Sequence, residues 1–281
     1  MQKLLVITDL HICTPGETII GLDPTLRFRQ VLDAALTTHP DAAALILMGD
    51  LTHRGLPAEY AALAAVLADV AVPVIPMLGN HDRRDAFLAA FPDAPRTAHG
   101  HIQSLLDLGD HRIITLDSLD GPPYRAGHHS GRLCPERLGF LTDALAGAQD
   151  KGALVFVHHP PFDTGIAGMD AIKLADGADL LALLRDHPRV HLVCGHIHRT
   201  ISGSTGGVPW TIFKSPCHQG VIDLTDTNSS LSVDEPGAYG LILLTDDGIV
   251  AHSEDVFAEP PATFADCAPI GRDRPVSENL P

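Results

Sequence analysis

Polar residues of the types that bind metal ions follow five apolar runs of this 281-residue chain, each at the point where the run ends. The runs are short and apolar, which predicts buried β-strands. The polar residues are Asp9 and His11, Asp50, Asn80 and His81, His158, and finally His196 and His198. Carboxylate, amide and imidazole groups are ligands of divalent cations, so the pattern predicts metal chemistry.

Ligands of open α/β sheets bind beyond the carboxyl ends of the strands, so we expect these groups to meet at one edge. Without His81, the set offers seven oxygen or nitrogen ligands. One cation takes about four to six ligands, so seven indicate two ions, and the two oxygens of Asp50 allow it to bridge them. Two ions about 3.5–4 Å apart can hold a phosphoryl group and activate water.

Each motif also has a purely structural interpretation. Asp9 and His11, or Gly49 and Asp50, could be ordinary turn residues at strand ends. The segment 79–82 could cap the helix predicted to begin near Arg84. The pair His196 and His198 is the most specific signal, because positions i and i+2 of an extended segment face the same side. Five such motifs together favour the metal site.

The order of the apolar runs predicts an α/β protein. We expect strands over 4–8, 44–48, 72–78, 112–116, 153–157 and 190–194, and helices over 26–38, 57–70, 84–91, 135–148 and 177–186. Strands expected over 208–214, 239–244 and 249–256 make the later part β-rich. We therefore predict a catalytic core over 1–201, a β-rich segment over 202–258 that completes the sheets and caps the site, and a tail over 259–281.

Charge and composition limit the classes of partner that we expect this protein to bind. There are 35 Asp and Glu against 19 Lys and Arg, and the formal net charge of −16 repels nucleic-acid polymers and anionic membranes. Five scattered cysteines without a CxxC pair are typical of reduced, cytoplasmic proteins. The apolar run near the N-terminus is too short for a signal peptide, which also predicts a cytoplasmic location.

The order D-x-H, GD, GNHD, HHPP and GHIH resembles the calcineurin-like metallophosphoesterase superfamily. It is most similar to the bacterial branch of class III cyclic-nucleotide phosphodiesterases and glycerophosphodiesterases. Further matches are the segment 55–60, the pair Met169 and Asp170, and the segment 215–219. The resemblance covers about residues 3–250.

The resemblance implies a four-layer αββα sandwich and two metal ions, which could be iron, manganese, zinc or cobalt. One ion would be held by Asp9, His11, His198 and Asp50, and the other by Asp50, Asn80, His158 and His196. A metal-bridging hydroxide would attack phosphorus. His81 would act as the catalytic acid, and Asn80, His81 and His198 would contact the substrate.

We therefore expect a phosphodiesterase for small diesters, either cyclic nucleotides or glycerophosphodiesters. The alternatives are a phosphomonoesterase or nuclease with the same site, or a non-catalytic scaffold of the same fold. His53 and His218 are candidate pocket residues, with Cys217 and Gln219 as further wall candidates. The apolar hairpin of the C-terminal segment could pair with a second subunit, which would make a homo-oligomer.

Overall fold

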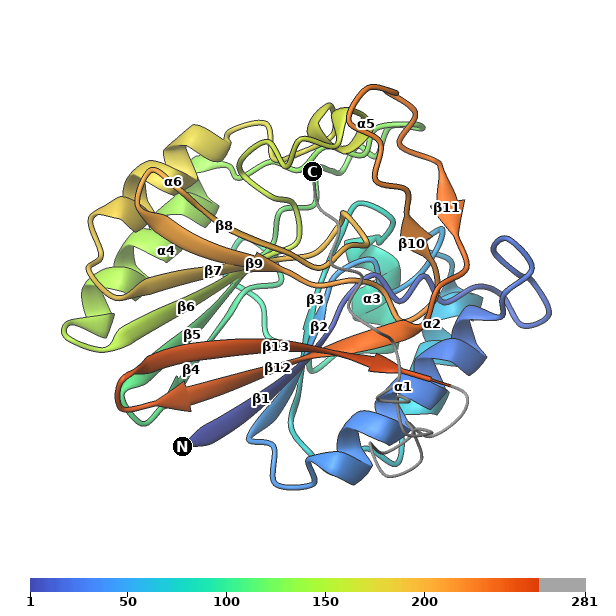
Figure 1. Ribbon diagram of the computed structural model, residues 1–281, viewed down its shortest axis with the longest axis horizontal. Helices are drawn as coiled ribbons and strands as arrows, with labels where there is room; N and C mark the ends of the chain where they lie inside the picture. Colours follow the sequence, from blue (N-terminus) through green and yellow to red (C-terminus); the bar gives the residue numbers. More distant parts are fainter. Residues whose placement is uncertain (258–281) are drawn as a thin grey trace, which may run out of the picture.

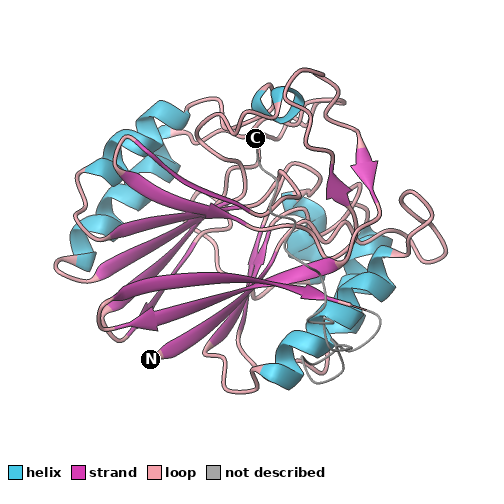
Figure 2. Ribbon diagram, in the orientation of Figure 1, coloured by secondary structure: helices cyan, strands magenta, loops and turns pink. Residues whose placement is uncertain are grey.

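Two β-sheets pack face to face between two layers of helices in this computed structural model, which describes residues 1–257 (Figure 1, Figure 2). The first sheet has the order β13 (Gly248–Val256), β12 (Gly237–Thr245), β1 (Gln2–Ile7), β2 (Ala44–Met48) and β3 (Val74–Met77). The second has the order β4 (Ser104–Leu108), β5 (His111–Leu116), β6 (Gly152–Val157), β7 (Val190–Cys194), β9 (Val208–Ile212) and β8 (Ile201–Thr205).

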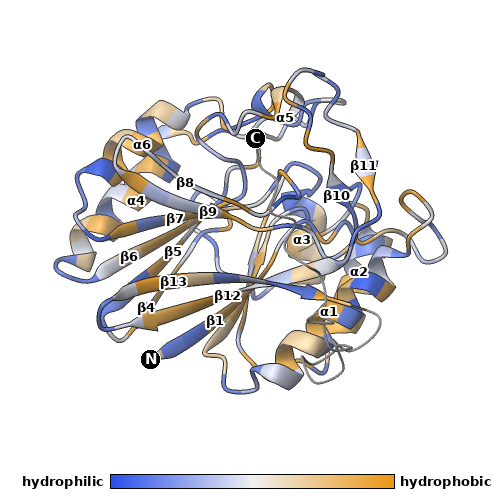
Figure 3. Ribbon diagram, viewed as in Figure 1, coloured by the Kyte–Doolittle hydropathy of each residue, from blue (hydrophilic) through white to orange (hydrophobic). Residues whose placement is uncertain are grey.

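The central strands are buried on both faces, as their continuous apolar runs predict. Every residue of β2 and of β6 is buried. Side chains from the facing surfaces of the two sheets, among them Val6, Ile46, Phe156 and Val193, form one core between them. The hydrophobic colour in Figure 3 follows these strands. Burial of this apolar surface is what holds the two sheets together.

Helices cover the outer face of each sheet. Three pack on the first sheet: α1 (Pro24–Thr38), α2 (Pro57–Leu67) and α3 (Arg84–Ala90). On the second sheet lie α4 (Pro135–Ala148) and α6 (Gly177–Arg185), with the short α5 (Ala167–Asp170) beside them. The predicted four-layer α/β sandwich is therefore confirmed. Among residues 1–257, no helix has both the length and the apolar character needed to cross a membrane.

Two strands of the second sheet, β4 and β8, are absent from the elements that the sequence predicts. Both lie at the edges of the second sheet and are partly exposed, so they lack a continuous apolar run. The helix expected over 57–70 ends at Leu67, and the strand expected over 72–78 is limited to β3.

The chain beyond residue 201 supplies strands to both sheets. It adds β9 next to β7 in the second sheet and β12 next to β1 in the first. Between them, β10 (Gln219–Gly220) and β11 (Ser232–Val233) form a small antiparallel pair. The division into a core and a capping segment stays a prediction, and the predicted tail over 259–281 lies outside the described residues.

Candidate active site

The five predicted strand ends meet where the two sheets come together. Strands β1, β2 and β3 run parallel in the first sheet, and β6 and β7 run parallel in the second. The eight predicted site residues follow directly on these strands: Asp9, His11, Asp50, Asn80, His81, His158, His196 and His198. The tertiary structure thus gathers groups that are up to 189 positions apart in the sequence around one point.

The distances between these groups suit shared metal ions. His11 Nε2 lies 3.0 Å from His198 Nε2, and His198 Nε2 lies 3.4 Å from Asp9 Oδ1. On the other side, His158 Nε2 lies 3.3 Å from Asp50 Oδ2. Two ligand atoms each about 2.1 Å from one ion lie about 3.0–3.4 Å apart in octahedral or tetrahedral geometry. The donor atoms are therefore spaced as ligands of common ions.

Several of these atoms are buried and lack a hydrogen-bond partner within the described chain, namely His158 Nε2, His196 Nε2 and Asn80 Oδ1. The other end of two of these side chains is anchored. His158 Nδ1 donates to the carbonyl oxygen of Met48 at 2.9 Å, and Asn80 Nδ2 donates to His129 Nδ1 at 2.9 Å. Buried polar atoms without partners are rare, and such anchoring is typical of metal ligands. The residues fit a metal centre.

The backbone is strained at five of the eight predicted site residues. Asp9, His11, Asp50, His196 and His198 have φ angles of +57°, +49°, +46°, +70° and +53°. This left-handed region is uncommon for residues other than glycine, and side chains in it are held there by surrounding structure. The fold thus turns the chain sharply after β1, β2 and β7, where these side chains join the cluster.

Two glycines of the motifs are required by close packing around the carboxylates. A Cβ atom on Gly79 would clash with Asp50 Oδ1, and one on Gly195 would clash with Thr8 Oγ1. Thr8 Oγ1 in turn donates to Asp9 Oδ2 at 2.8 Å. Gly79 therefore makes room for the Asp50 carboxylate, and Gly195 for the Thr8 hydroxyl that donates to the Asp9 carboxylate.

The electrostatic environment keeps the carboxylates ionised. Burial alone would raise the pKa of Asp50, but His158, His81 and His11 hold that pKa well below its usual value. Burial, followed by the neighbouring His158, lowers the pKa of His196 to about 3. Burial would also lower the pKa of His158, but Asp50 and Asp9 raise it to about 9. The cluster thus holds anionic oxygens and neutral imidazoles at His11 and His196, while His158 would release a proton when a cation binds.

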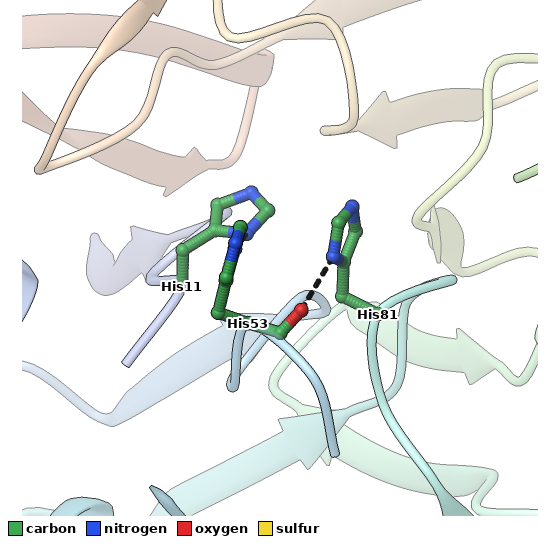
Figure 4. A group of neighbouring side chains, drawn as sticks. All are labelled: His11, His53 and His81. Carbon is green, nitrogen blue, oxygen red and sulfur yellow. Dashed lines mark hydrogen bonds between the residues drawn. The ribbon is translucent and has the colours of Figure 1, made fainter. Parts of the chain in front are cut away.

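His81 is oriented by two hydrogen bonds. Its backbone N–H donates to Asp50 Oδ1 at 2.8 Å, and its ring Nδ1 donates to the carbonyl oxygen of His53 at 2.7 Å. Figure 4 shows the remaining ring nitrogen pointing away from this anchor, with His11 and His53 beside the ring. His81 Nε2 is therefore free to meet a substrate.

Asp82, the last residue of the GNHD motif, is structural. Its carboxylate accepts from the N–H groups of Leu51 and Gly79 and from the Tyr60 hydroxyl, each at 3.0 Å. Burial, followed by the nearby Asp50 charge, raises the pKa of Asp82 to about 6. The side chain ties the loop after β2 to the loop after β3.

A cavity of about 350 Å³ lies over the cluster. His53 and His218 line it, as the sequence suggested, whereas Cys217 and Gln219 do not. Gln219 is instead buried, with Oε1 accepting from the Ser215 N–H at 3.2 Å. His129 also lines the cavity, and sequence reasoning missed it because it lies in a loop without a motif.

A four-layer sandwich with a cluster of carboxylate, amide and imidazole groups at the ends of its strands is the arrangement expected of a metallophosphoesterase. The family model described as calcineurin-like phosphoesterase matches residues 2–200. The chain therefore belongs to the calcineurin-like phosphoesterase family, and the resemblance noted in the sequence is confirmed.

Relatives and solved structures agree with this membership. A probable cyclic nucleotide phosphodiesterase of Rhodopseudomonas palustris is 41% identical over 89% of this chain and 91% of its own length. The glycerophosphodiester phosphodiesterase GpdQ of Enterobacter lignolyticus is 32% identical over 76% of this chain and 79% of its own. A dimetal phosphatase of Danio rerio, 16% identical, shares the fold with a TM-score of 0.67, covering 91% of this chain and 96% of that one.

Proposed function

We propose that this protein is a dinuclear metal-dependent phosphodiesterase that hydrolyses small phosphodiesters, either cyclic nucleotides or glycerophosphodiesters. The observation that carries the proposal is the convergence of two carboxylates, one amide and four imidazoles between the sheets, with buried donor atoms that lack partners. The names of the relatives from Rhodopseudomonas palustris and Enterobacter lignolyticus support this range of substrates.

In this proposal Asp9, His11 and His198 hold one ion, Asn80, His158 and His196 hold the other, and Asp50 belongs to both. The mixed oxygen and nitrogen set suits iron, manganese, zinc or cobalt. When bound, the ions supply Lewis acidity that activates water and neutralises charge on the phosphoryl oxygens.

Side chains of the protein orient the substrate and protonate the leaving group. His81 Nε2 faces the cavity, so we assign it a hydrogen bond to the phosphoryl group and donation of a proton to the departing alkoxide. Asn80 and His198 also line the cavity and are placed to contact the substrate.

The size and charge of the cavity favour small diesters. Its volume of about 350 Å³ is that of a small-ligand pocket, and none of its described lining residues is Lys or Arg. A polymer would need a basic track for its backbone, and a monoester dianion would be repelled more strongly by the net charge of −16.

The test is one substrate panel on the metal-loaded enzyme, with metal content measured in parallel. We expect kcat/KM for bis(p-nitrophenyl) phosphate to exceed that for p-nitrophenyl phosphate, with cleavage of cyclic nucleotides or glycerophosphodiesters and little cleavage of single-stranded oligonucleotides. A preference for the monoester, or efficient degradation of the oligonucleotide at physiological salt, would point to a phosphatase or nuclease instead. A protein that binds no metal and hydrolyses none of these substrates would indicate the non-catalytic scaffold of the same fold.

We also propose a cytoplasmic location, supported by the free thiols of Cys13, Cys134, Cys194 and Cys217. Homo-oligomerisation through the hairpin of β12 and β13 is a further proposal, supported by the position of β13 at a sheet edge. Sedimentation of the purified protein tests the second proposal.

A further inference from the structure

The mouth of the active-site cavity carries apolar side chains that the proposed chemistry does not use. Ile20 is 52% exposed and Leu231 is 37% exposed, and both line the cavity. They come from separate segments, one following β1 and one preceding β11. In Figure 1 the dark blue loop after β1 extends next to β11. Met169 and Ile172, beside α5, line the same cavity.

Ile20 is held at this exposed position in an unfavourable backbone conformation. Ile19 and Leu22 exchange two backbone hydrogen bonds, at 2.9 and 2.8 Å, which closes a two-residue turn. The central residues, Ile20 and Gly21, have φ angles of +46° and +83°, as in a type I′ turn. Such turns favour Asn, Asp or Gly at the first central position, and a β-branched residue with positive φ is an outlier. Strain at the edge of a site points to a function.

The side chains that line the cavity limit the kinds of chemical group that its mouth could bind. Beside the apolar side chains, Ser229, Ser230 and Ser232 offer hydroxyl groups. Among the described lining residues there is no Phe, Tyr, Trp or Glu, and Asp50 is the only Asp. A quaternary ammonium group is bound by aromatic faces or carboxylates, so this mouth lacks its partners. A flat, neutral group with hydrogen-bonding edges matches both the apolar faces and the hydroxyls.

We propose that Ile20 and Leu231 form an apolar clamp that seats a neutral, flat group, such as a nucleobase, carried by one alcohol of the diester. The inference rests on the proposed phosphodiesterase function and names the residues that select its substrate. Contact with the clamp holds the flat group, while the phosphodiester reaches the cluster below. The clamp therefore acts on substrate binding and leaves the chemical step unchanged.

A matched pair of substrates isolates the clamp. Adenosine 3′,5′-cyclic phosphate and 1-deoxyribose 3′,5′-cyclic phosphate share the reacting ring and differ only in the base. We expect wild-type kcat/KM to favour the first. Ile20→Asn and Leu231→Ser should each lower it about 10-fold, through KM, because removing apolar contacts from a pocket costs about that factor. The base-free ester should be unaffected. Leu26→Ser, at an exposed apolar position of α1 that does not line the cavity, is the control.

Stability provides a second readout, because Asn suits the first central position of a type I′ turn. Ile20→Asn should therefore melt at the wild-type temperature or above, which separates a binding defect from misfolding. Equal wild-type kcat/KM for the two cyclic esters, or equal losses on both in the variants, would overturn the clamp while leaving a phosphodiesterase. Absence of hydrolysis of every diester in the panel would overturn the proposed function and the clamp with it.

Discussion

The amide nitrogen of Asn80 lies 2.9 Å from Nδ1 of His129, and this contact leaves the amide oxygen of Asn80 buried without a hydrogen-bond partner in the described chain. The carbonyl oxygen of His129 accepts from His159 Nε2 at 3.1 Å, and His159 Nδ1 accepts from the Ser118 hydroxyl at 2.7 Å. A hydrogen-bonded chain from the second sheet thus sets the orientation of a predicted ligand on the first.

His129→Ala should weaken metal binding at the site of Asn80, because the amide becomes free to rotate. Loss of a partner that orients a ligand costs about 10–100-fold in metal affinity. Calorimetric titration of the apoprotein with Mn²⁺ or Zn²⁺ measures this loss of metal affinity. His129→Gln, which keeps an acceptor, should recover part of it. The neighbouring His128→Ala, whose ring pairs with Asp120, should bind metal as the wild type does.

Asp50→Asn should remove more bound metal than Asp9→Asn, because a neutral amide replaces the carboxylate that we propose both ions would share. Atomic absorption of the purified proteins measures metal per chain. Wild-type metal content in both variants would contradict the bridging role of Asp50.

His81→Ala should affect substrates according to their leaving groups. An alkyl alkoxide needs a proton to depart, so its hydrolysis should slow by about 10²–10⁴-fold. A p-nitrophenolate leaves without a proton, so the hydrolysis of its esters should slow by a smaller factor. Steady-state kcat on one substrate of each kind decides the point. If the two losses are the same, His81 acts as an electrostatic contact to the phosphoryl oxygens and not as an acid.

Asp117→Asn should destabilise the fold at neutral pH. Asp117 is fully buried and accepts from Arg84 Nε at 2.7 Å and Nη2 at 2.8 Å. Breaking a buried ion pair by neutralising one partner costs about 3–5 kcal/mol. Urea unfolding at pH 7 measures this difference in the free energy of unfolding. Asp107→Asn, at an exposed pair with Arg112, is the control and should change little.

The contribution of Asp117 to the free energy of unfolding should decrease at low pH. Burial alone would raise its pKa, but Arg84 lowers it below the value of 3.8 that applies to the unfolded chain. The folded state therefore binds this proton less readily, and the stabilisation is present above about pH 4. It is lost as the pH falls through the lower pKa of the folded state. The gap between wild type and Asp117→Asn should narrow below pH 4, and a constant gap down to pH 2 would contradict this account.

The apolar runs of the sequence predicted an α/β protein, its family resemblance predicted the four layers, and the eight residues that it singled out lie together in the structure. Short continuous apolar runs such as those of β2 and β6 favour strands buried on both faces, and ligands of α/β sheets bind beyond the carboxyl ends of the strands. Local order along the chain therefore predicts which groups converge. The edge strands β4 and β8 escaped prediction because partly exposed strands lack such a run.

Only the tertiary structure decided which residues orient and surround that cluster. His129 lies 49 positions from Asn80, and His159 lies 41 positions from Ser118, in loops without periodicity. Ile20 and Leu231 reach one cavity from opposite ends of the chain. Such contacts depend on how the two sheets pack and how loops cross their ends, and no local pattern of residue types specifies that packing.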